Sequence, residues 1–585
     1  MRSLWIGGAV AATLVLGVAV WCAWQAWQVA RSLEEAVDHA SALRSALTAE
    51  DADAAEATAA AEVELAALRE ASADAADRTD TATWGMLTRL PWLGDDAHGV
   101  RTTSRVIDDL ATDGLAPLLE VSDRVDQLLP HGGAVDLDAL RDLSGPVSDA
   151  QQAFDDADRT LQAEDASGFT TRLADRFHDF RGQVAQADKA MTAASTTLDI
   201  LPGMLGADEP RTILMVFQNN AEIRATGGLP GAVTALHADD GVLTIGRQVS
   251  GGSFGETAAP VLPLTKPERD QFGNLLGTYF VNANLTPDVP RAADLMRARW
   301  ELAYPGESVD GVLLVDTVSL GYVLDETGPI TVDGIELRGD TVVEELLHTT
   351  YLRLDDPRAQ DQFFADVAAE AFERFTSGAG GGAGLVGALA QSVDEHRVFA
   401  HSFHTEEQEH LSGSPVAGEL ITDPEVKEPQ ITVTMNDTTA AKLSYFLRYE
   451  VDANATYCTD GVQGFAAKAR LWSTAPTDAA DLPAYVAGRG VTTEPGSQIV
   501  TVRVLAPAGG RAQAFTLNAK PLTPLRTVQD GRPVAEFYIE LAPGQKVDLA
   551  WTMRGGAGQT GDSAYTVTPS IAEQDHSGSI ESACR

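Results

Sequence analysis

The chain has 585 residues, with 42 lysines and arginines against 85 aspartates and glutamates, and a formal net charge of −43 at pH 7. This acidic balance lacks the basic footprint that binding to nucleic acid requires, so we exclude nucleic acid as a partner. It also opposes contact of the chain's body with anionic lipid, and the length indicates about three domains.

The N-terminal segment LWIGGAVAATLVLGVAVWCAW, residues 4–24, contains no charged residue. A run of about 20 apolar residues is long enough to cross a bilayer. Trp21, Trp24 and Trp27 lie at its far end, where indole rings favour the headgroup layer. A cleaved signal peptide is the alternative, but the apolar run is longer than such peptides usually have. We therefore expect a cytoplasmic stub over residues 1–3, a single transmembrane helix over 4–29 and an extracytoplasmic body, with the cell membrane as a partner through this helix.

Residues 30–200 predict a helical stalk or bundle, rich in Ala, Leu and acidic residues. The clearest helix carries apolar residues at alternating spacings of four and three: Leu173, Phe177, Phe180, Val184, Ala187, Met191, Ala194 and Leu198. Such a heptad seam packs against partner helices, so it permits self-association through the stalk without requiring it.

Residues 208–428 predict an α/β core, because buried strands such as TILMVF (212–217) and VDGVLLVD (309–316) alternate with helical patterns. From residue 429 to 585 the chain consists of short alternating strands separated by turns, which predicts a β-sandwich. The expected fold is therefore multidomain: a transmembrane helix, a helical stalk, an α/β core and a C-terminal β-sandwich.

Three cysteines occur, and Cys22 lies within the apolar N-terminal run. The other two, Cys458 and Cys584, are suited to a disulfide that fixes the C-terminal tail to the last domain. Their distance in space is not visible in the sequence, so two unpaired thiols remain the alternative.

The segment QNNAEIRATGGLPG, residues 218–231, follows a buried strand, which is where α/β proteins place ligands. Asn219, Asn220 and Thr226 offer hydrogen bonds, and Gly227 and Gly228 permit close approach of the backbone. We regard these five residues as candidates for substrate binding.

Arg224 in the same segment carries a fork of donors that suits phosphate. The alternative is a structural turn in which Arg224 pairs with a neighbouring carboxylate such as Glu222. The residues alone do not decide between the two interpretations.

The motifs QNNAEIRATGG, NANLTPDVPRAADL, DGVLLVDTVSLGYVLDETGPITVDG and YLRLDDPRAQDQF resemble the actinobacterial domain of unknown function 4012 family. The resemblance extends from about Leu33 to the C-terminus. It implies membership of the family but no activity, because no activity of the family is established.

The α/β core also resembles, more weakly, the LytR–CpsA–Psr (LCP) phosphotransferases, which move glycopolymers from polyprenyl pyrophosphate onto peptidoglycan. The resemblance implies catalytic roles for Arg353 and Arg358, which would neutralise the pyrophosphate, and substrate binding by Asn284 and Gln362. Arg224 is catalytic only by analogy, because the loop around it differs.

Magnesium is the cofactor that this resemblance implies, with Asp288 and Asp316 as candidate ligands. The chain departs from the pattern at two places. Its core strand starts with Arg211 and Thr212 instead of an acidic metal ligand, and Asp361 replaces the second arginine of an Arg-x-x-Arg-Gln segment. Both departures weaken a pyrophosphate site.

We therefore expect a membrane-anchored cell-envelope protein that binds or transfers polyprenyl-pyrophosphate-linked glycopolymers. If it is an enzyme, it is an LCP-like glycopolymer phosphotransferase or a pyrophosphatase. The alternative is a non-enzymatic envelope scaffold or binding protein, and the missing carboxylate at the start of the core strand favours this alternative.

Overall fold

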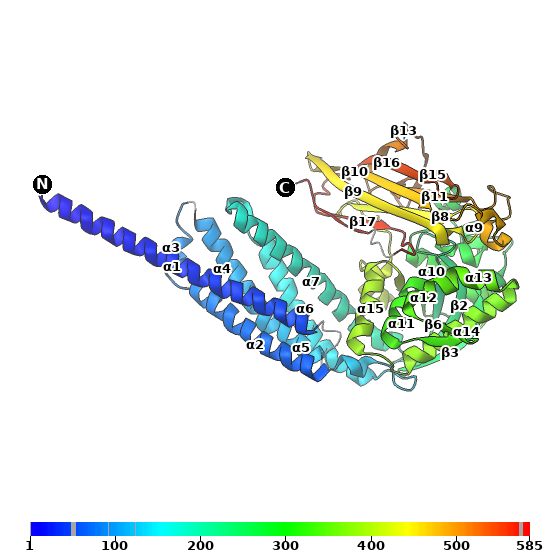
Figure 1. The fold of residues 1–585 in the computed structure, drawn as a ribbon, viewed down its shortest axis with the longest axis horizontal. Helices are drawn as coiled ribbons and strands as arrows, with labels where there is room; N and C mark the ends of the chain where they lie inside the picture. Colours follow the sequence, from blue (N-terminus) through cyan, green and yellow to red (C-terminus); the bar gives the residue numbers. More distant parts are fainter. Residues whose placement is uncertain (1, 48–53, 92, 123, 573–576, 585) are drawn as a thin grey trace. The chain divides into compact units, whose positions relative to one another are not determined.

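The computed structural model describes residues 2–47, 54–91, 93–122, 124–572 and 577–584 (Figure 1). The chain forms two compact units. The first comprises Met1–Leu128 and Asp136–Pro202, and the second comprises Leu129–Val135 and Gly203–Arg585.

The first unit is helical (blue to cyan in Figure 1). Its main helices are α1 (Arg2–Leu47), α2 (Ala54–Thr79), α3 (Trp84–Leu87), α4 (Gly94–Asp109), α5 (Leu115–Ser122), α6 (Leu137–Ala163) and α7 (Thr171–Met204). The heptad seam of α7 faces the interior, where Phe177 and Val184 are buried in one cluster with Phe154 and Leu161 of α6. Apolar side chains at this spacing form one stripe on the helix, and burial of that stripe stabilises the helical unit.

The N-terminal segment forms the start of α1. In the described part of the chain, however, no helix combines the length and the apolar character that crossing a bilayer requires. This finding corrects the expectation of a transmembrane helix over residues 4–29 and of a single-pass localisation. The membrane as a partner stays a prediction. In the part of α1 whose side chains are described, Val29, Ala36 and Leu43 are buried within the helical unit and are separated by charged residues, as in an amphipathic helix.

The second unit begins with a five-stranded sheet in the order β3-β2-β1-β4-β7. The strands are β1 (Arg211–Asn219), β2 (Leu229–Asp239), β3 (Val242–Ser250), β4 (Gly311–Asp316) and β7 (Val398–Ser402). Strands β1 and β4 are parallel, whereas β1 and β2 are antiparallel, as are β2 and β3, and β4 and β7. The β2–β3 turn is tight because Asp240 and Gly241 both adopt positive φ, at 48° and 78°.

Helices surround this sheet. Strand residues such as Leu214 and Leu314 share a core with Met296 and Trp300 of α10 (Val289–Ala303). A smaller core joins α11, α12 and α14 to a two-stranded sheet. The other elements of this region are α8 (Lys266–Phe272), α9 (Leu275–Thr278), α11 (Thr317–Thr327), β5 (Ile330–Val332), β6 (Ile335–Leu337), α12 (Gly339–Glu344), α13 (Thr350–Arg353), α14 (Pro357–Thr376), α15 (Gly382–Asp394) and α16 (Thr405–Leu411).

The rest of the second unit is a β-sandwich with sheets in the orders β13-β12-β16-β10-β9 and β14-β15-β11-β8-β17-β18. Alternating apolar residues of both sheets form one core, which includes Trp551 and Phe465. The elements are β8 (Gln430–Asp437), β9 (Leu447–Thr459), β10 (Val462–Ser473), α17 (Ala484–Ala487), β11 (Gln498–Leu505), β12 (Arg511–Leu517), β13 (Lys520–Pro521), β14 (Leu525–Gln529), β15 (Arg532–Leu541), β16 (Lys546–Arg554), β17 (Ser563–Val567) and β18 (Gly578–Ile580).

Candidate functional site

The loop that follows β1, residues 220–228, is anchored in the β-sandwich. Ile223 is 3% exposed and belongs to the sandwich core. Its carbonyl accepts a hydrogen bond from the backbone N–H of Asp437, and the backbone N–H of Ala225 donates to Oδ1 of Asn436. The loop therefore joins the α/β region to the sandwich, and its conformation depends on contacts distant in sequence.

Arg224 in this loop has a structural role. Its Nη2 lies 3.0 Å from Oε1 of Glu222, and its Nη1 donates to the carbonyls of Ile223 and Asp437. Arg224 is 6% exposed and does not line the cavity described below. The structure thus matches the alternative in which Arg224 pairs with Glu222 inside a structural turn.

A second cation, Lys442, completes this buried ionic cluster. Its Nζ lies 3.1 Å from Oε2 of Glu222. Burial acts to raise the pKa of Glu222, but the positive charges of Lys442 and Arg224 outweigh it and hold the pKa below its ordinary value. Burial likewise acts to lower the pKa of Lys442, but Tyr351 and Glu222 outweigh it and raise the pKa. Glu222 and Lys442 are therefore ionised together.

Asn284 holds the loop after β1 through hydrogen bonds. It is fully buried, and its Nδ2 donates to Oε1 of Gln218 at 3.0 Å, to Oγ1 of Thr226 at 2.9 Å and to the carbonyl oxygen of Gly228 at 2.8 Å. Thr226 also donates to Gln218 at 2.6 Å. Gly228 is required because a Cβ there would lie 2.3 Å from the carbonyl carbon of Asn219. The close approach predicted for Gly228 is thus to the chain's own backbone, whereas a Cβ at Gly227 would meet side chains, with Cγ of Pro569 at 3.4 Å.

The two carboxylates proposed as metal ligands lie in different surroundings. Asp316 caps α11 by accepting from the backbone N–H of Ser319, and its Oδ2 accepts from Asn220 at 2.9 Å and from Arg397 at 3.0 Å. Asp288 accepts from the backbone N–H of Leu420, and burial raises the pKa of Asp288 to about 6. Among the described residues, no group of three or more histidine, cysteine, aspartate or glutamate side chains is placed to hold a metal ion.

The remaining residues assigned by resemblance lie apart from this loop. Nη1 of Arg353 is 2.5 Å from Oε1 of Glu345. Arg358 is exposed at the start of α14, and exposed Gln362 donates to Asp366 at 2.8 Å. Neither arginine lines the cavity. The expected meeting of three guanidinium groups at one pyrophosphate site is therefore not formed, because Arg224 and Arg353 have their own carboxylates and Arg358 is at the surface.

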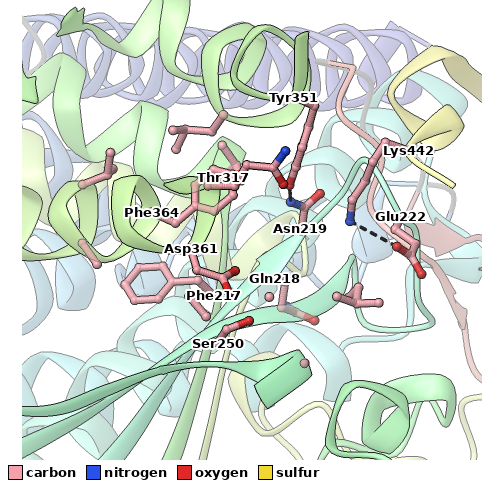
Figure 2. A pocket seen from close by; sticks show the side chains of 18 of the residues that line it. Phe217, Gln218, Asn219, Glu222, Ser250, Thr317, Tyr351, Asp361, Phe364 and Lys442 are labelled. Carbon is pink, nitrogen blue, oxygen red and sulfur yellow. Dashed lines mark hydrogen bonds and ion pairs between the residues drawn. The ribbon is translucent and has the colours of Figure 1, made fainter. Parts of the chain in front are cut away.

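A cavity of about 290 Å³ lies in the second unit, beside the ends of β1 and β4 (Figure 2). Two of the candidate residues line it: Asn219 at the end of β1 and Asp316 at the end of β4. The other walls come from β2, β3, α11, α13 and α14 and from two sandwich residues, Lys442 and Tyr485. The apolar and aromatic lining residues include Phe217, Leu229, Val281, Leu320, Leu346, Tyr351, Phe364, Val367 and Tyr485.

An aromatic corner forms one wall of the cavity. Tyr351 is 4% exposed, its hydroxyl accepts from Nδ2 of Asn219 at 2.5 Å, and burial raises the pKa of Tyr351 to about 12. Its ring centroid lies 5.7 Å from that of Tyr485, and Nζ of Lys442 lies 5.4 Å and 5.5 Å from the two rings. The cation is thus held between two aromatic faces and Glu222.

The polar groups of the cavity differ in how they are satisfied. Lys442 and Glu222 pair with each other, and Asp316 pairs with Arg397. Asp361 of α14 has no ion-pair partner among the described residues, and burial raises its pKa. The lining is therefore apolar and aromatic, with amide and carboxyl groups and no uncompensated cation.

Several of these residues escaped the sequence analysis. Tyr351 stands immediately before Leu352 and Arg353, in a segment that we interpreted only through its arginines. Lys442 and Tyr485 belong to the sandwich, so no local pattern connects them with the loop after β1. Of these residues, the sequence pointed to Asp361 alone, because Asp361 stands where the LCP pattern has an arginine.

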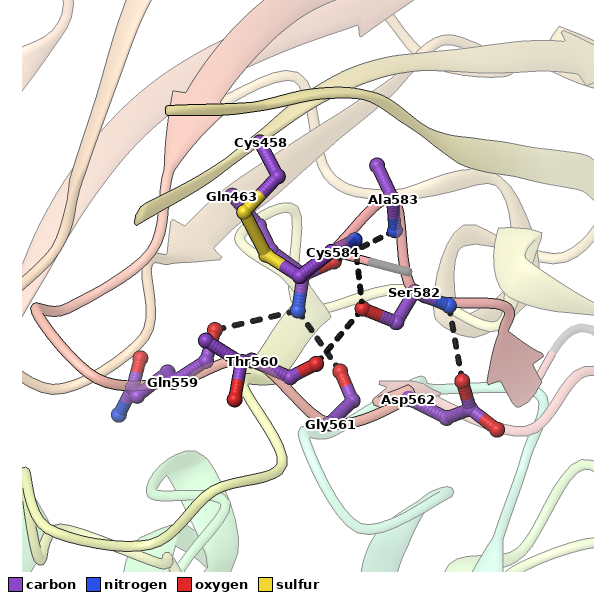
Figure 3. Close-up of a disulfide and its surroundings, with 9 residues drawn as sticks. All are labelled: Cys458, Gln463, Gln559, Thr560, Gly561, Asp562, Ser582, Ala583 and Cys584. Atoms are coloured by element: carbon purple, nitrogen blue, oxygen red, sulfur yellow. Dashed lines mark hydrogen bonds between the residues drawn. A yellow bond between two sulfur atoms is a disulfide. The ribbon is translucent and has the colours of Figure 1, made fainter. Parts of the chain in front are cut away.

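A disulfide joins Cys458 of β9 to Cys584 in the C-terminal tail (Figure 3). The Cα atoms are 5.0 Å apart. Gln463 supports the tail, because its Oε1 accepts from the backbone N–H of Ala583 and its Nε2 donates to the carbonyls of Gln559 and Gly561. The bond closes a segment with a sequence separation of 126 residues.

Residues 208–351 match a family model described as protein of unknown function (DUF4012). The matched range begins just before β1 and ends at Tyr351, so it contains the loop after β1 and part of the cavity wall. No curated protein and no solved structure matches the chain. The resemblance to LCP phosphotransferases stays a prediction.

Proposed function

This chain is a member of the DUF4012 family, and we propose that it is a non-enzymatic binding protein that holds a glycan segment of a glycopolymer in the cavity of its second unit. The observation that supports the proposal is the lining of the cavity, where aromatic rings and amide and carboxyl groups stand side by side. Sugars present apolar C–H faces and a rim of hydroxyl groups. Rings pack against such faces, and amides and carboxylates bond to such hydroxyls.

The cavity volume agrees with this ligand class. At about 290 Å³ it lies at the lower end of the roughly 300–1,000 Å³ that small-molecule sites occupy. It therefore suits one segment of a polymer better than a long lipid chain.

The charges of the site disfavour a pyrophosphate in the cavity. Phosphate groups are bound by cations free to donate, and often by bidentate arginines. Lys442 is the one cation among the lining residues of this cavity, and Glu222 neutralises it. Transfer from polyprenyl pyrophosphate would need cations beside the leaving group. Arg224 and Arg353 do not line the cavity, and each is paired with a carboxylate.

Isothermal titration of the full chain with soluble oligosaccharides and with a short-chain prenyl pyrophosphate tests the proposal. Replacement Tyr485→Ala removes an aromatic lining residue that is 46% exposed, so the fold tolerates it. Tyr457→Ala is the matched control, because Tyr457 is 45% exposed and lies on β9 outside the cavity.

We expect an oligosaccharide to bind, and Tyr485→Ala to weaken it about tenfold, which corresponds to about 1.4 kcal/mol. Tyr457→Ala is expected to leave the affinity unchanged. Binding of the prenyl pyrophosphate without any oligosaccharide, or equal effects of both tyrosine replacements, would contradict the proposal.

A further inference from the structure

Asp361 is the charged lining residue of the cavity that the structure leaves without a counter-ion. Glu222 and Lys442 are 3.1 Å apart, and Asp316 has Arg397 at 3.0 Å. Asp361 has no ion pair within the part of the chain that the structure describes, and its hydrogen-bonding neighbour is the hydroxyl of Ser250. Figure 2 shows the Asp361 carboxyl beside Ser250 and Gln218, on the cavity side of α14.

Gln218, beside Asp361, is held by the loop after β1. Oε1 of Gln218 accepts from Thr226 and Asn284, which fixes the orientation of the amide. Its Nε2 is enclosed, and a Cβ at Gly227 would lie 3.6 Å from it, so this donor faces the loop. Of these two neighbouring side chains, Asp361 is therefore the one that offers its polar group to a ligand.

The Asp361 carboxylate is open to a ligand, and it stands on a cavity wall beside aromatic rings. A carboxylate without a counter-ion attracts a positive group. An amino sugar with a free amine presents such a group on a ring that has apolar C–H faces. The aromatic walls favour its ring and also attract its ammonium group.

We infer that the glycan segment held in the cavity carries a protonated amine, as a de-N-acetylated amino sugar does, and that Asp361 pairs with this amine. The inference rests on the proposed function, since it names the ligand class of the same cavity. Asp361 is also where the LCP pattern has an arginine, so the charge there is opposite to that of a phosphate site.

The test compares two tetrasaccharides of glucosamine, one with free amines and one fully N-acetylated, by isothermal titration with the full chain at about pH 6. The variant Asp361→Asn removes the charge and keeps the shape. Asp355→Asn is the control, because Asp355 is an exposed carboxylate shortly before α14 and does not line the cavity. Circular dichroism of each variant checks that the fold is retained.

We expect the wild type and Asp355→Asn to bind the free-amine tetrasaccharide at least about tenfold more tightly than the acetylated one, and Asp361→Asn to lose this preference. Persistence of the preference in Asp361→Asn would overturn the inference, because the overall negative charge of the chain would then explain it. Equal binding of both sugars by the wild type would overturn the inference and leave the proposed function standing. Binding of neither sugar would overturn both.

Discussion

The buried pair of Glu222 and Lys442 allows a quantitative test of how the loop after β1 is held. The side chains of Glu222 and Lys442 are 11% and 3% exposed, and their charged atoms are 3.1 Å apart. Removal of one partner from such a pair leaves an uncompensated buried charge, at a cost of about 3–5 kcal/mol. Arg224 still contacts Glu222 at 3.0 Å in the variant Lys442→Met. We therefore expect this replacement to lower the free energy of unfolding by about 3 kcal/mol, at the lower end of that range.

Glu222→Gln is expected to cost about 3–4 kcal/mol, because Lys442 and Arg224 then lose their shared anion. The double variant, Glu222→Gln with Lys442→Met, is expected to cost little more than either single change. The resulting coupling energy is about 2–3 kcal/mol. Additive costs of the single changes would refute the view that these groups form one cluster.

The assay is urea unfolding of the full chain, with hydrogen exchange in peptides from β8 and β9 as the readout. This readout reports on the sandwich, so unfolding of the helical unit does not obscure the result. The pH dependence gives a second check. Because the pKa of Glu222 in the folded chain lies below the ordinary value of 4.5, its stabilising effect is present above that pH and is lost as the pH falls through the folded pKa. Glu222→Gln should remove this part of the acid sensitivity.

Three further outcomes are expected. Replacing Cys458 and Cys584 by Ser should lower the free energy of unfolding of the second unit by about 2–5 kcal/mol, since the bond closes a separation of 126 residues; no change in the urea midpoint would contradict this. Asp288 has a folded pKa of about 6 against 3.8, so stability should fall by up to about 3 kcal/mol as the pH rises from about 4 to 6, and Asp288→Asn should abolish that fall in thermal unfolding curves. Leu161→Ala in the core of the helical unit should cost about 3 kcal/mol by helical circular dichroism, whereas a loss under about 1 kcal/mol would indicate a loosely packed bundle.

Local patterns predicted those parts of the fold that depend on neighbouring residues. Strands β1 and β4 follow from the apolar runs at residues 212–217 and 309–316, which need only the local sequence. The segment after β1 was also correctly expected at the end of a buried strand, and Asn219 lines the cavity there.

The role of Arg224 was not predictable, because it depends on distant residues. Ile223 enters the core of the sandwich, and this contact carries Arg224 into a buried pair with Glu222 instead of into the cavity. Lys442 and Tyr485 reach the same cavity from the sandwich. These contacts depend on how the α/β region packs against the β-sandwich, and no local pattern in either segment predicts them.

The most direct test of the cavity's role is a crystal structure of the full chain with the free-amine glucosamine tetrasaccharide. We expect one sugar ring inside the cavity, packed against Tyr351 or Phe364, with its amine within hydrogen-bonding distance of Asp361. A sugar bound elsewhere on the chain while the cavity between β1 and α14 holds none would contradict the account.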